Sequence, residues 1–192
     1  MKSLKILMIL IACTWFAVAT KAQTYIQGVA VRPFSEIANT NTHISTANRM
    51  AYSAAKDLVN SFYAHTTRIK GLDKMAGEYF LVDGMVVELT CRNRTADNDF
   101  RPFTQSQIEF REMFTNMIGE TNTLEADYYD ELKTVNGNEI LKYYYTSVNY
   151  KTFLIQDLLG KYVVLGTIYC AMQDIAKAEA FIDTLVGSIV FK

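Results

Sequence analysis

The sequence predicts an α+β domain in which a mostly antiparallel sheet carries helices packed on it. Three pairs of β-rich segments are each joined by a short turn, so consecutive strands are expected to pair as hairpins. Three longer segments repeat apolar residues at helical spacing. Half of the 192 residues are apolar and only two are proline. This composition is typical of a globular chain and excludes a disordered one.

The first 22 residues have the three parts of a secretory signal peptide. Two lysines form a basic start, an apolar run extends from Ile6 to Ala19, and Thr20-Lys21-Ala22 places small residues at a cleavage site. The apolar run is shorter than the roughly 20 residues that a membrane-spanning helix needs. We therefore expect cleavage after Ala22, which leaves residues 23–192 as a single domain.

A lipoprotein is the alternative interpretation of this segment. Leu10-Ile11-Ala12-Cys13 resembles a bacterial lipobox, in which the cysteine is lipidated and becomes the new N-terminus. The apolar run continues past Cys13, where a lipoprotein normally turns polar, so the sequence favours a cleaved signal. We expect an exported protein, periplasmic or secreted, which is anchored to a membrane only if Cys13 is lipidated.

The charge of the exported part disfavours nucleic acid as a partner. The chain has 19 basic and 20 acidic residues, and loss of Lys2, Lys5 and Lys21 leaves 16 basic residues against 20 acidic ones. The basic residues are scattered along the chain and form no patch in the sequence. A nucleic-acid partner would require such a patch.

The first half of the domain predicts a strand, a helix and a hairpin. Residues 24–32 are β-rich, 35–46 are polar and irregular, and 47–65 carry one apolar stripe with a four-residue recurrence. Asp83-Gly84 then joins residues 78–82 to 85–91, and this dipeptide is a strong hairpin signal. In the second arm alternate residues share a face. The face expected to meet the core carries Met85, Val87, Leu89 and Cys91, and the more polar face carries Val86, Glu88, Thr90 and Arg92.

The second half predicts a helix at 105–118 and then four strands. Thr104 and Gln107 fit a capping box, Phe103 and Ile108 fit a hydrophobic staple, and Gly119 fits the end of the helix. Asn-Gly at 136–137 joins strands 126–135 and 139–147, and a third hairpin joins 149–158 to 161–171 near Gly160. The strand at 162–169 is apolar on both faces, which indicates a central strand. A helix at 175–186, capped by Asp174 and closed by Gly187, precedes a short strand at 189–191.

The C-terminal half resembles the PsbP-like fold. The resemblance rests on Asn-Gly-Asn at 136–138, the run Tyr143-Tyr144-Tyr145, the strand Gly-Lys-Tyr-Val-Val-Leu at 160–165 and the ending at 185–192, where a helix feeds a Ser-Ile-x-Phe strand. It extends over residues 105–192, whereas the N-terminal half departs from the family pattern. It implies an α/β/α sandwich that works by binding, usually to another protein, without chemistry of its own. No functional residue of the family maps onto this sequence.

Few residues suggest chemistry. His43 and His65 stand alone, and the chain has neither a Gly-x-Ser-x-Gly motif nor a glycine-rich phosphate loop. Asp97 and Asp99 are a weak candidate for a metal site, because the glycine and distal glutamate of a calcium loop are missing. Asp127, Asp130 and Glu131 form a second acidic group, which we interpret as solvated. We therefore expect no catalytic residues, no cofactor and no enzyme.

The two cysteines of the mature chain leave two interpretations open. Export would permit a disulfide between Cys91 and Cys170. Both residues lie in apolar, strand-like runs, which favours two buried thiols instead.

Tyrosine is the unusual component of the composition. All 12 tyrosines follow the signal segment, and eight lie between residues 128 and 169. Each ring has an apolar body and a polar tip, so a row of them suits a wet interface or a sugar- or peptide-binding face. The alternative is that they fill a core between sheet and helix. The candidates for a binding face are Tyr128, Tyr144, Tyr150 and Tyr169.

These observations favour a protein-binding accessory module of the cell envelope, with another envelope protein as its partner. Such a module predicts an exposed apolar or aromatic patch. The alternative is a protein that binds a small ligand, such as a sugar, a peptide or a lipid, on a Tyr-rich face or in a pocket between sheet and helix.

Overall fold

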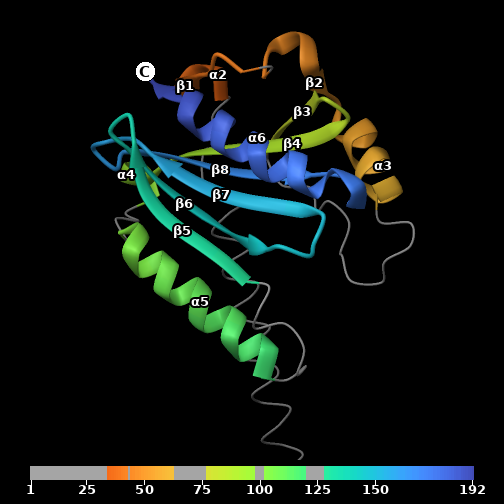
Figure 1. The fold of residues 1–192 in the computed structure, drawn as a ribbon. Helices are drawn as coiled ribbons and strands as arrows, with labels where there is room; N and C mark the ends of the chain where they lie inside the picture. Colours follow the sequence, from red (N-terminus) through yellow and green to blue (C-terminus); the bar gives the residue numbers. More distant parts are fainter. Residues whose placement is uncertain (1–33, 43, 63–76, 98–101, 120–127) are drawn as a thin grey trace, which may run out of the picture. The chain divides into compact units, whose positions relative to one another are not determined.

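The structure is a computed structural model, and it describes residues 34–42, 44–62, 77–97, 102–119 and 128–192 (Figure 1). The expected signal segment 1–22 with Cys13, the strand expected at 24–32, both histidines, Asp99 and Asp127 lie outside the described residues.

The described residues form five helices and nine strands. The helices are α2 (Phe34–Ile37), α3 (Tyr52–Phe62), α4 (Arg94–Asp97), α5 (Phe103–Gly119) and α6 (Ile175–Ser188). Single 3-10 turns occupy Thr46–Asn48 and Met172–Asp174. The strands are β1 (Ala38–Asn39), β2 (Arg49–Met50), β3 (Glu78–Val82), β4 (Met85–Asn93), β5 (Tyr128–Val135), β6 (Asn138–Tyr145), β7 (Tyr150–Gln156), β8 (Tyr162–Tyr169) and β9 (Val190–Phe191).

The main sheet has seven strands in the order β2-β3-β4-β8-β7-β6-β5, and every neighbouring pair is antiparallel. The predicted α+β class and the antiparallel sheet are therefore confirmed. The doubly apolar strand β8 lies at the centre of the sheet, as its sequence predicts. Strands β5 to β8 form a meander that returns to pair with β4. The last strand, β9, pairs with β1 in a separate two-stranded sheet.

Two turns fix the register of the sheet as their sequences predict. Asp83 and Gly84 have φ of 50° and 81°, and Asn136 and Gly137 have φ of 52° and 82°. Two successive positive φ angles define the type I′ turn, whose twist matches the flanking strands. The hairpins β3–β4 and β5–β6 are therefore specified locally.

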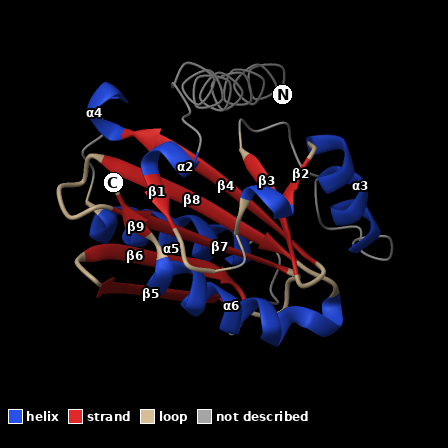
Figure 2. Ribbon diagram, turned by 90° about the horizontal axis from the view of Figure 1, so that it is seen from above, coloured by secondary structure: helices blue, strands red, loops and turns tan. Residues whose placement is uncertain are grey.

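Helix α6 covers one face of the sheet, where the largest core cluster lies (Figures 1 and 2). The buried stripe of α6 packs against β7 and β8. The opposite face is covered in two places. Helix α3 packs Ala55 and Val59 against Tyr79 and Val86, and the start of α5 packs against β6 and β8 through Phe103. Because α3 and α5 lie over different strands, the strands between them are only half-buried.

A close approach in the α6 face depends on one glycine. The ring of Phe153 in β7 lies directly over Gly166 in β8, its antiparallel partner. A Cβ added at Gly166 would lie 2.0 Å from Cζ of Phe153, far inside a normal carbon–carbon contact of about 3.5–4.0 Å. Phe153 itself is fully buried. Only glycine leaves room for this ring.

Two buried lysines connect α6 with the sheet. Nζ of Lys142 lies 2.6 Å from Oε2 of Glu131 and 2.9 Å from Oδ1 of Asp183. Nζ of Lys151 donates to the backbone oxygens of Tyr145 and Thr146, each at 2.9 Å, and lies 3.2 Å from Oε1 of Glu179. Three partners satisfy the three donors of the Lys151 ammonium, which makes this lysine structural.

The starts of two helices differ from the prediction. The helix expected at 47–65 begins at Tyr52, because Arg49 and Met50 pair with β3. Helix α5 begins at Phe103, and the amides of Gln105 and Ser106 donate to Pro102, so Thr104 forms no capping box. The amide of the Gln107 side chain donates instead to Asp130.

The remaining differences concern exposed positions and the ends of α6. Ile108 of α5 is exposed, so the expected staple between Phe103 and Ile108 is absent. Asp174 precedes α6 without a side-chain cap, because a 3-10 turn leads into the helix. Gly187 lies inside the last turn and does not close the helix.

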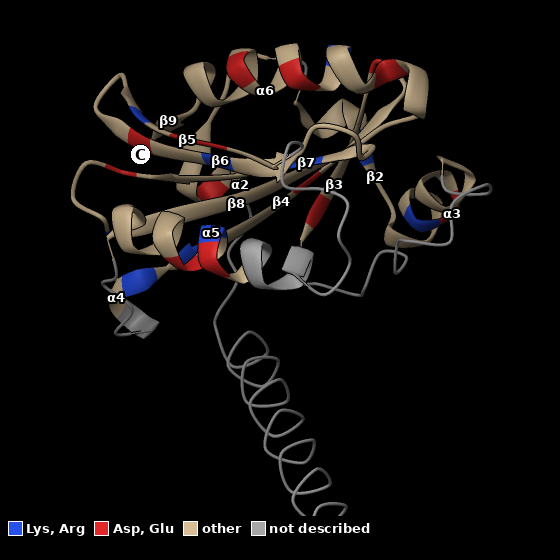
Figure 3. Cartoon of the chain, turned by 60° about the horizontal axis from the view of Figure 1, so that its bottom comes forward, with Lys and Arg blue, Asp and Glu red and all other residues tan. Residues whose placement is uncertain are grey.

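In the part of the chain that the structure describes, no helix is both long enough and apolar enough to cross a membrane. Acidic and basic residues are interspersed on α5 and α6 (Figure 3).

Candidate functional site

The candidate site lies on the half-buried face of the sheet, where one row of residues crosses five strands. The register places Tyr143 of β6 opposite Thr152 of β7, Thr152 opposite Thr167 of β8, and Thr167 opposite Glu88 of β4. Tyr79 of β3 is next to Glu88. Directly opposed residues point to the same side of a sheet. Thr152 and Thr167 therefore lie between the larger side chains of Tyr143 and Glu88, and their small size leaves a depression in this face of the sheet.

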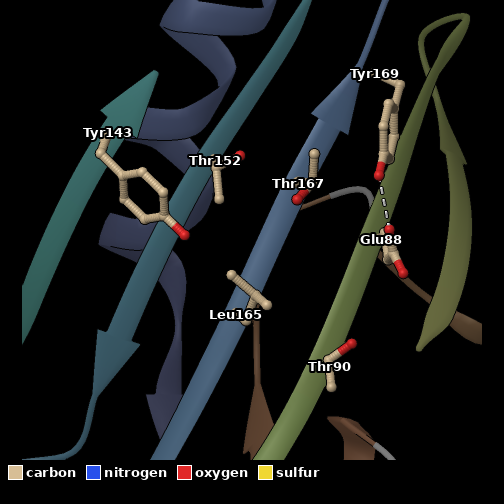
Figure 4. Close-up of a pocket in the computed structure, with 7 residues that line it drawn as sticks. All are labelled: Glu88, Thr90, Tyr143, Thr152, Leu165, Thr167 and Tyr169. Carbon is tan, nitrogen blue, oxygen red and sulfur yellow. Dashed lines mark hydrogen bonds between the residues drawn. The ribbon is translucent and has the colours of Figure 1, made fainter. Parts of the chain in front are cut away.

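A cavity of about 230 Å³ occupies this hollow. The row above and its two neighbouring rows supply the lining, as Figure 4 shows. The lining residues are Glu88, Thr90, Tyr143, Thr152, Leu165, Thr167 and Tyr169. Strands are about 4.8 Å apart, so Tyr143 on β6 and Tyr169 on β8 stand about 10 Å from each other across the sheet. The floor of the cavity carries the hydroxyl groups of Thr90, Thr152 and Thr167 and the side chain of Leu165.

Glu88 is the charged residue of this lining and is 6% exposed. Its carboxylate accepts hydrogen bonds from two tyrosine hydroxyls, 3.2 Å from Tyr79 to Oε1 and 2.9 Å from Tyr169 to Oε2. Burial raises the pKa of Glu88 above its ordinary value, and the two hydrogen bonds only partly oppose this. A Cβ at Gly77 would lie only 3.1 Å from Cγ of Glu88, so glycine at this position leaves room for the side chain.

Among the described residues that line the cavity, none is a lysine, arginine or histidine. A buried carboxylate is normally compensated by a paired cation, because the loss of hydration is costly. The described neighbours of Glu88 compensate it only with neutral hydroxyl groups. The cavity is therefore electronegative, with acceptor capacity left on the carboxylate.

The end of the cavity nearest α5 is rigid. The ring of Tyr143 stacks on Phe110 of α5 at a centroid distance of 4.2 Å and an interplanar angle of 17°. Arg111 of α5 donates to both carboxylate oxygens of Asp130 on β5, at 3.0 Å and 2.5 Å. Although burial raises the pKa of Asp130, the hydrogen bonds from Arg111 and Gln107 hold that pKa below its ordinary value. A charged clamp therefore fixes α5 beside the pocket.

The four tyrosines proposed from the sequence lie on both faces of the sheet. Tyr169 lines the pocket, and Tyr150 is its cross-strand partner. Tyr128 is opposite Tyr145 in β5–β6 and shares the pocket's face. Tyr144 points to the α6 face, where it is buried, stacks on Tyr129 and lies 4.6 Å from Nζ of Lys151. Tyr144 is therefore a core residue.

The cysteines form no disulfide. Cys91 and Cys170 are both free and buried. Cys91 is opposite Val164 in β8, six residues before Cys170, which places the two Cα atoms roughly 20 Å apart along the strand direction. A disulfide requires less than about 7 Å. Burial raises the pKa of Cys91 to about 12 and that of Cys170 to about 11, so both thiols stay protonated at neutral pH.

Asp130 and Glu131 of the second acidic group lie on opposite faces of the sheet. Asp97 ends α4, Asp130 binds α5, and Glu131 points to the other face, where it pairs with Lys142. Among the described residues, no group of three His, Cys, Asp or Glu side chains is placed to hold a metal ion.

Glu88 was missed because the alternation in β4 assigns it to a polar face. Val86, Glu88 and Thr90 of that face are all buried. The available signal was a single acid inside the long apolar run from Met85 to Cys91, since glutamate is almost never buried without a specific role.

Comparisons of the chain with protein-family models, with curated proteins and with solved structures gave no match. The PsbP-like resemblance therefore stays a prediction.

Proposed function

We propose that this chain is an exported protein that binds a small ligand in the pocket between α3 and α5 and performs no chemistry on it. The observation that carries this proposal is the hollow row of the sheet, where Glu88 and Tyr143 flank two threonines. The signal-like segment supports export. The pocket resembles ligand sites in general, because a few convergent polar groups stand among apolar and aromatic walls.

The cavity limits the size of the ligand. Its volume of about 230 Å³ corresponds to about eight water molecules in the liquid, at about 30 Å³ each. Drug-sized ligands occupy pockets of about 300–1,000 Å³. The pocket therefore suits a small metabolite or a single projecting group of a larger molecule, and it is too small for a whole lipid or a folded peptide segment.

The groups in the pocket favour binding over catalysis. General acid–base catalysis typically pairs groups of different pKa at the reacting atoms. The titratable groups of the lining are Glu88, Tyr143 and Tyr169, and burial raises the pKa of Tyr143 well above its ordinary value. One carboxylate among neutral hydroxyls orients a ligand through hydrogen bonds, which is the role we assign to it.

The test is a ligand screen with a blocked pocket. The purified protein is screened by ligand-observed NMR against small amines, sugars, acids and apolar compounds. Thr152→Phe fills the floor of the cavity, and Thr134→Phe is the matched control, because Thr134 is exposed on the edge strand β5. We expect compounds that bind the wild type and Thr134→Phe but not Thr152→Phe. Binding that survives Thr152→Phe, or no binding by the wild type, would overturn the proposal.

A protein-binding module is the second candidate, and one observation favours it. Leu158 and Leu159 form the tip of the β7–β8 hairpin and are 79% and 85% exposed. Two neighbouring leucines at a projecting tip are suited to an apolar contact with a partner. Leu158→Ser with Leu159→Ser should abolish capture of a partner from envelope extract if this candidate is correct, whereas Thr152→Phe should leave capture unchanged.

A further inference from the structure

We propose that the ligand of this pocket is a small organic ammonium ion, which Glu88 binds as its counter-ion. This inference rests on the proposed function, because it names the chemical class that the same pocket takes. It follows from the charge, the donor and acceptor groups and the aromatic walls around the cavity.

Glu88 is the acidic residue among the described residues that line the cavity. The side chain is buried, lines the cavity and accepts hydrogen bonds from two tyrosine hydroxyls of the described residues. A buried carboxylate that lacks a cation is costly to the folded protein. An ammonium ion in the cavity would supply the missing positive charge. An anionic ligand would add a second negative charge, which none of the described lining residues could compensate with a cation.

The hydrogen-bonding groups match the same class. An ammonium group has three donors and no acceptor. Each oxygen of Glu88 uses one acceptor site for a tyrosine hydroxyl and retains another. The hydroxyl oxygens of Thr90, Thr152 and Thr167 add acceptors along the floor. One donor of the ligand to Glu88 and two to threonine oxygens would satisfy the group completely.

The walls suit the organic part of the ligand. The rings of Tyr143 and Tyr169 stand at opposite ends of the cavity, with Leu165 on its floor (Figure 4). Aromatic faces attract cations within about 6 Å of the ring centroid, and Leu165 offers an apolar surface to a short alkyl chain. A neutral sugar would use the hydroxyls but would leave the carboxylate without a counter-ion.

Few described groups face Glu88, so the pH dependence of ligand binding should report the protonation of this carboxylate. Tyr79 of β3 and Tyr169 of β8 donate to it, Tyr143 of β6 lies across the cavity, and the buried residues of α3 are the uncharged Ala55 and Val59. Burial raises the pKa of Tyr79 and that of Tyr143 above the ordinary tyrosine value of about 10, so these two hydroxyls stay protonated below pH 9. An ammonium ligand should therefore bind more weakly as falling pH protonates Glu88.

The experiment compares three probes of similar size: n-butylammonium, n-butanol and butyrate. Binding to the purified protein is measured by titration calorimetry and by NMR between pH 5 and pH 8. We expect n-butylammonium to bind best and its affinity to fall with pH. In Glu88→Gln the affinity should drop roughly tenfold or more, because a hydrogen bond to a charged group is lost, and the pH dependence should vanish. Tyr169→Phe, which keeps the charge, should weaken binding less and retain the pH dependence.

The outcomes separate this inference from the function on which it rests. If n-butanol binds as tightly as n-butylammonium, or if Glu88→Gln binds n-butylammonium normally, the ammonium class is wrong. If n-butylammonium does not bind, but another compound binds the wild type and not Thr152→Phe, the ammonium class is also wrong. The pocket is then still a ligand site. If Thr152→Phe weakens the binding of no compound, the proposed function itself is wrong. Thr134→Phe controls for a general effect of added bulk.

Discussion

Replacing Gly166 by alanine should destabilise the protein more than adding a methyl group at any other position in the sheet. The added Cβ would lie 2.0, 2.3 and 2.7 Å from three ring carbons of Phe153. A normal contact is about 3.5–4.0 Å, so the ring must retreat by roughly 1.5 Å. Phe153 is fully buried and belongs to the main core cluster, which leaves no open space for this movement.

The magnitude follows from the two ways in which the core can respond. Overpacking typically costs about 1–3 kcal/mol. Expelling the ring approaches the about 3–5 kcal/mol of a buried Phe→Ala change. We expect Gly166→Ala to lower the free energy of unfolding by about 3 kcal/mol. At about 2–4 °C per kcal/mol for a domain of 150–250 residues, the melting temperature should fall by about 6–12 °C.

The assay is urea unfolding followed by far-UV circular dichroism. Gly187→Ala is the matched control, because this glycine lies inside α6 and an added Cβ meets nothing within 4 Å. Alanine is favoured over glycine in a helix by up to about 1 kcal/mol, so this variant should be neutral or slightly stabilised. A loss below about 1 kcal/mol for Gly166→Ala, or the same loss in a Phe153→Leu background, would refute the reasoning.

Three further predictions follow from the charges and the signal segment. The pKa of Glu88 is raised from its ordinary 4.5, so the wild type should lose stability relative to Glu88→Gln as pH rises from 4.5 through the folded-state pKa; urea midpoints over a pH series measure this difference. Lys142→Met should cost about 1–2 kcal/mol at pH 7, because Glu131 and Asp183 lose a buried cation but remain partly hydrated. The hydrogen bond from Lys142 holds the pKa of Glu131 below its ordinary value, so this cost should shrink as pH falls below about 4, and an unchanged cost at low pH would contradict the pairing. N-terminal sequencing of the exported protein should begin at Gln23, whereas a start at Cys13 would indicate a lipoprotein.

The sequence predicted the parts of the fold that depend on neighbouring residues. Asp83-Gly84 and Asn136-Gly137 fix two hairpins because a type I′ turn needs two positive φ angles within two residues. The stripe of α6 was predicted because its period is local. The central place of β8 was predicted because both of its faces are apolar.

The candidate site could not be predicted in the same way, because it depends on strands that are distant in the sequence. The pairing of β4 with β8 places Glu88 beside Thr167, and no local pattern specifies this partner. Polar alternation normally indicates a solvent-facing surface, and it assigned Glu88 to a polar face that the long-range packing buries. The predicted start of α5 was wrong for a similar reason. The side chain of Gln107 donates a hydrogen bond to Asp130 of β5 and does not cap the helix.

The seam between β4 and β8 has a consequence for the order of folding. The hairpin β3–β4 and the meander β5–β8 can each form from near neighbours, but the pocket lies across the junction of the two. The bond between Glu88 and Tyr169 joins residues that are 81 positions apart. Closing so long a loop is slow and entropically costly, so the binding site is completed only when the two halves of the sheet dock. A ligand that requires both halves therefore has no affinity for either half alone. It slows unfolding of the finished domain and gives no acceleration to its assembly.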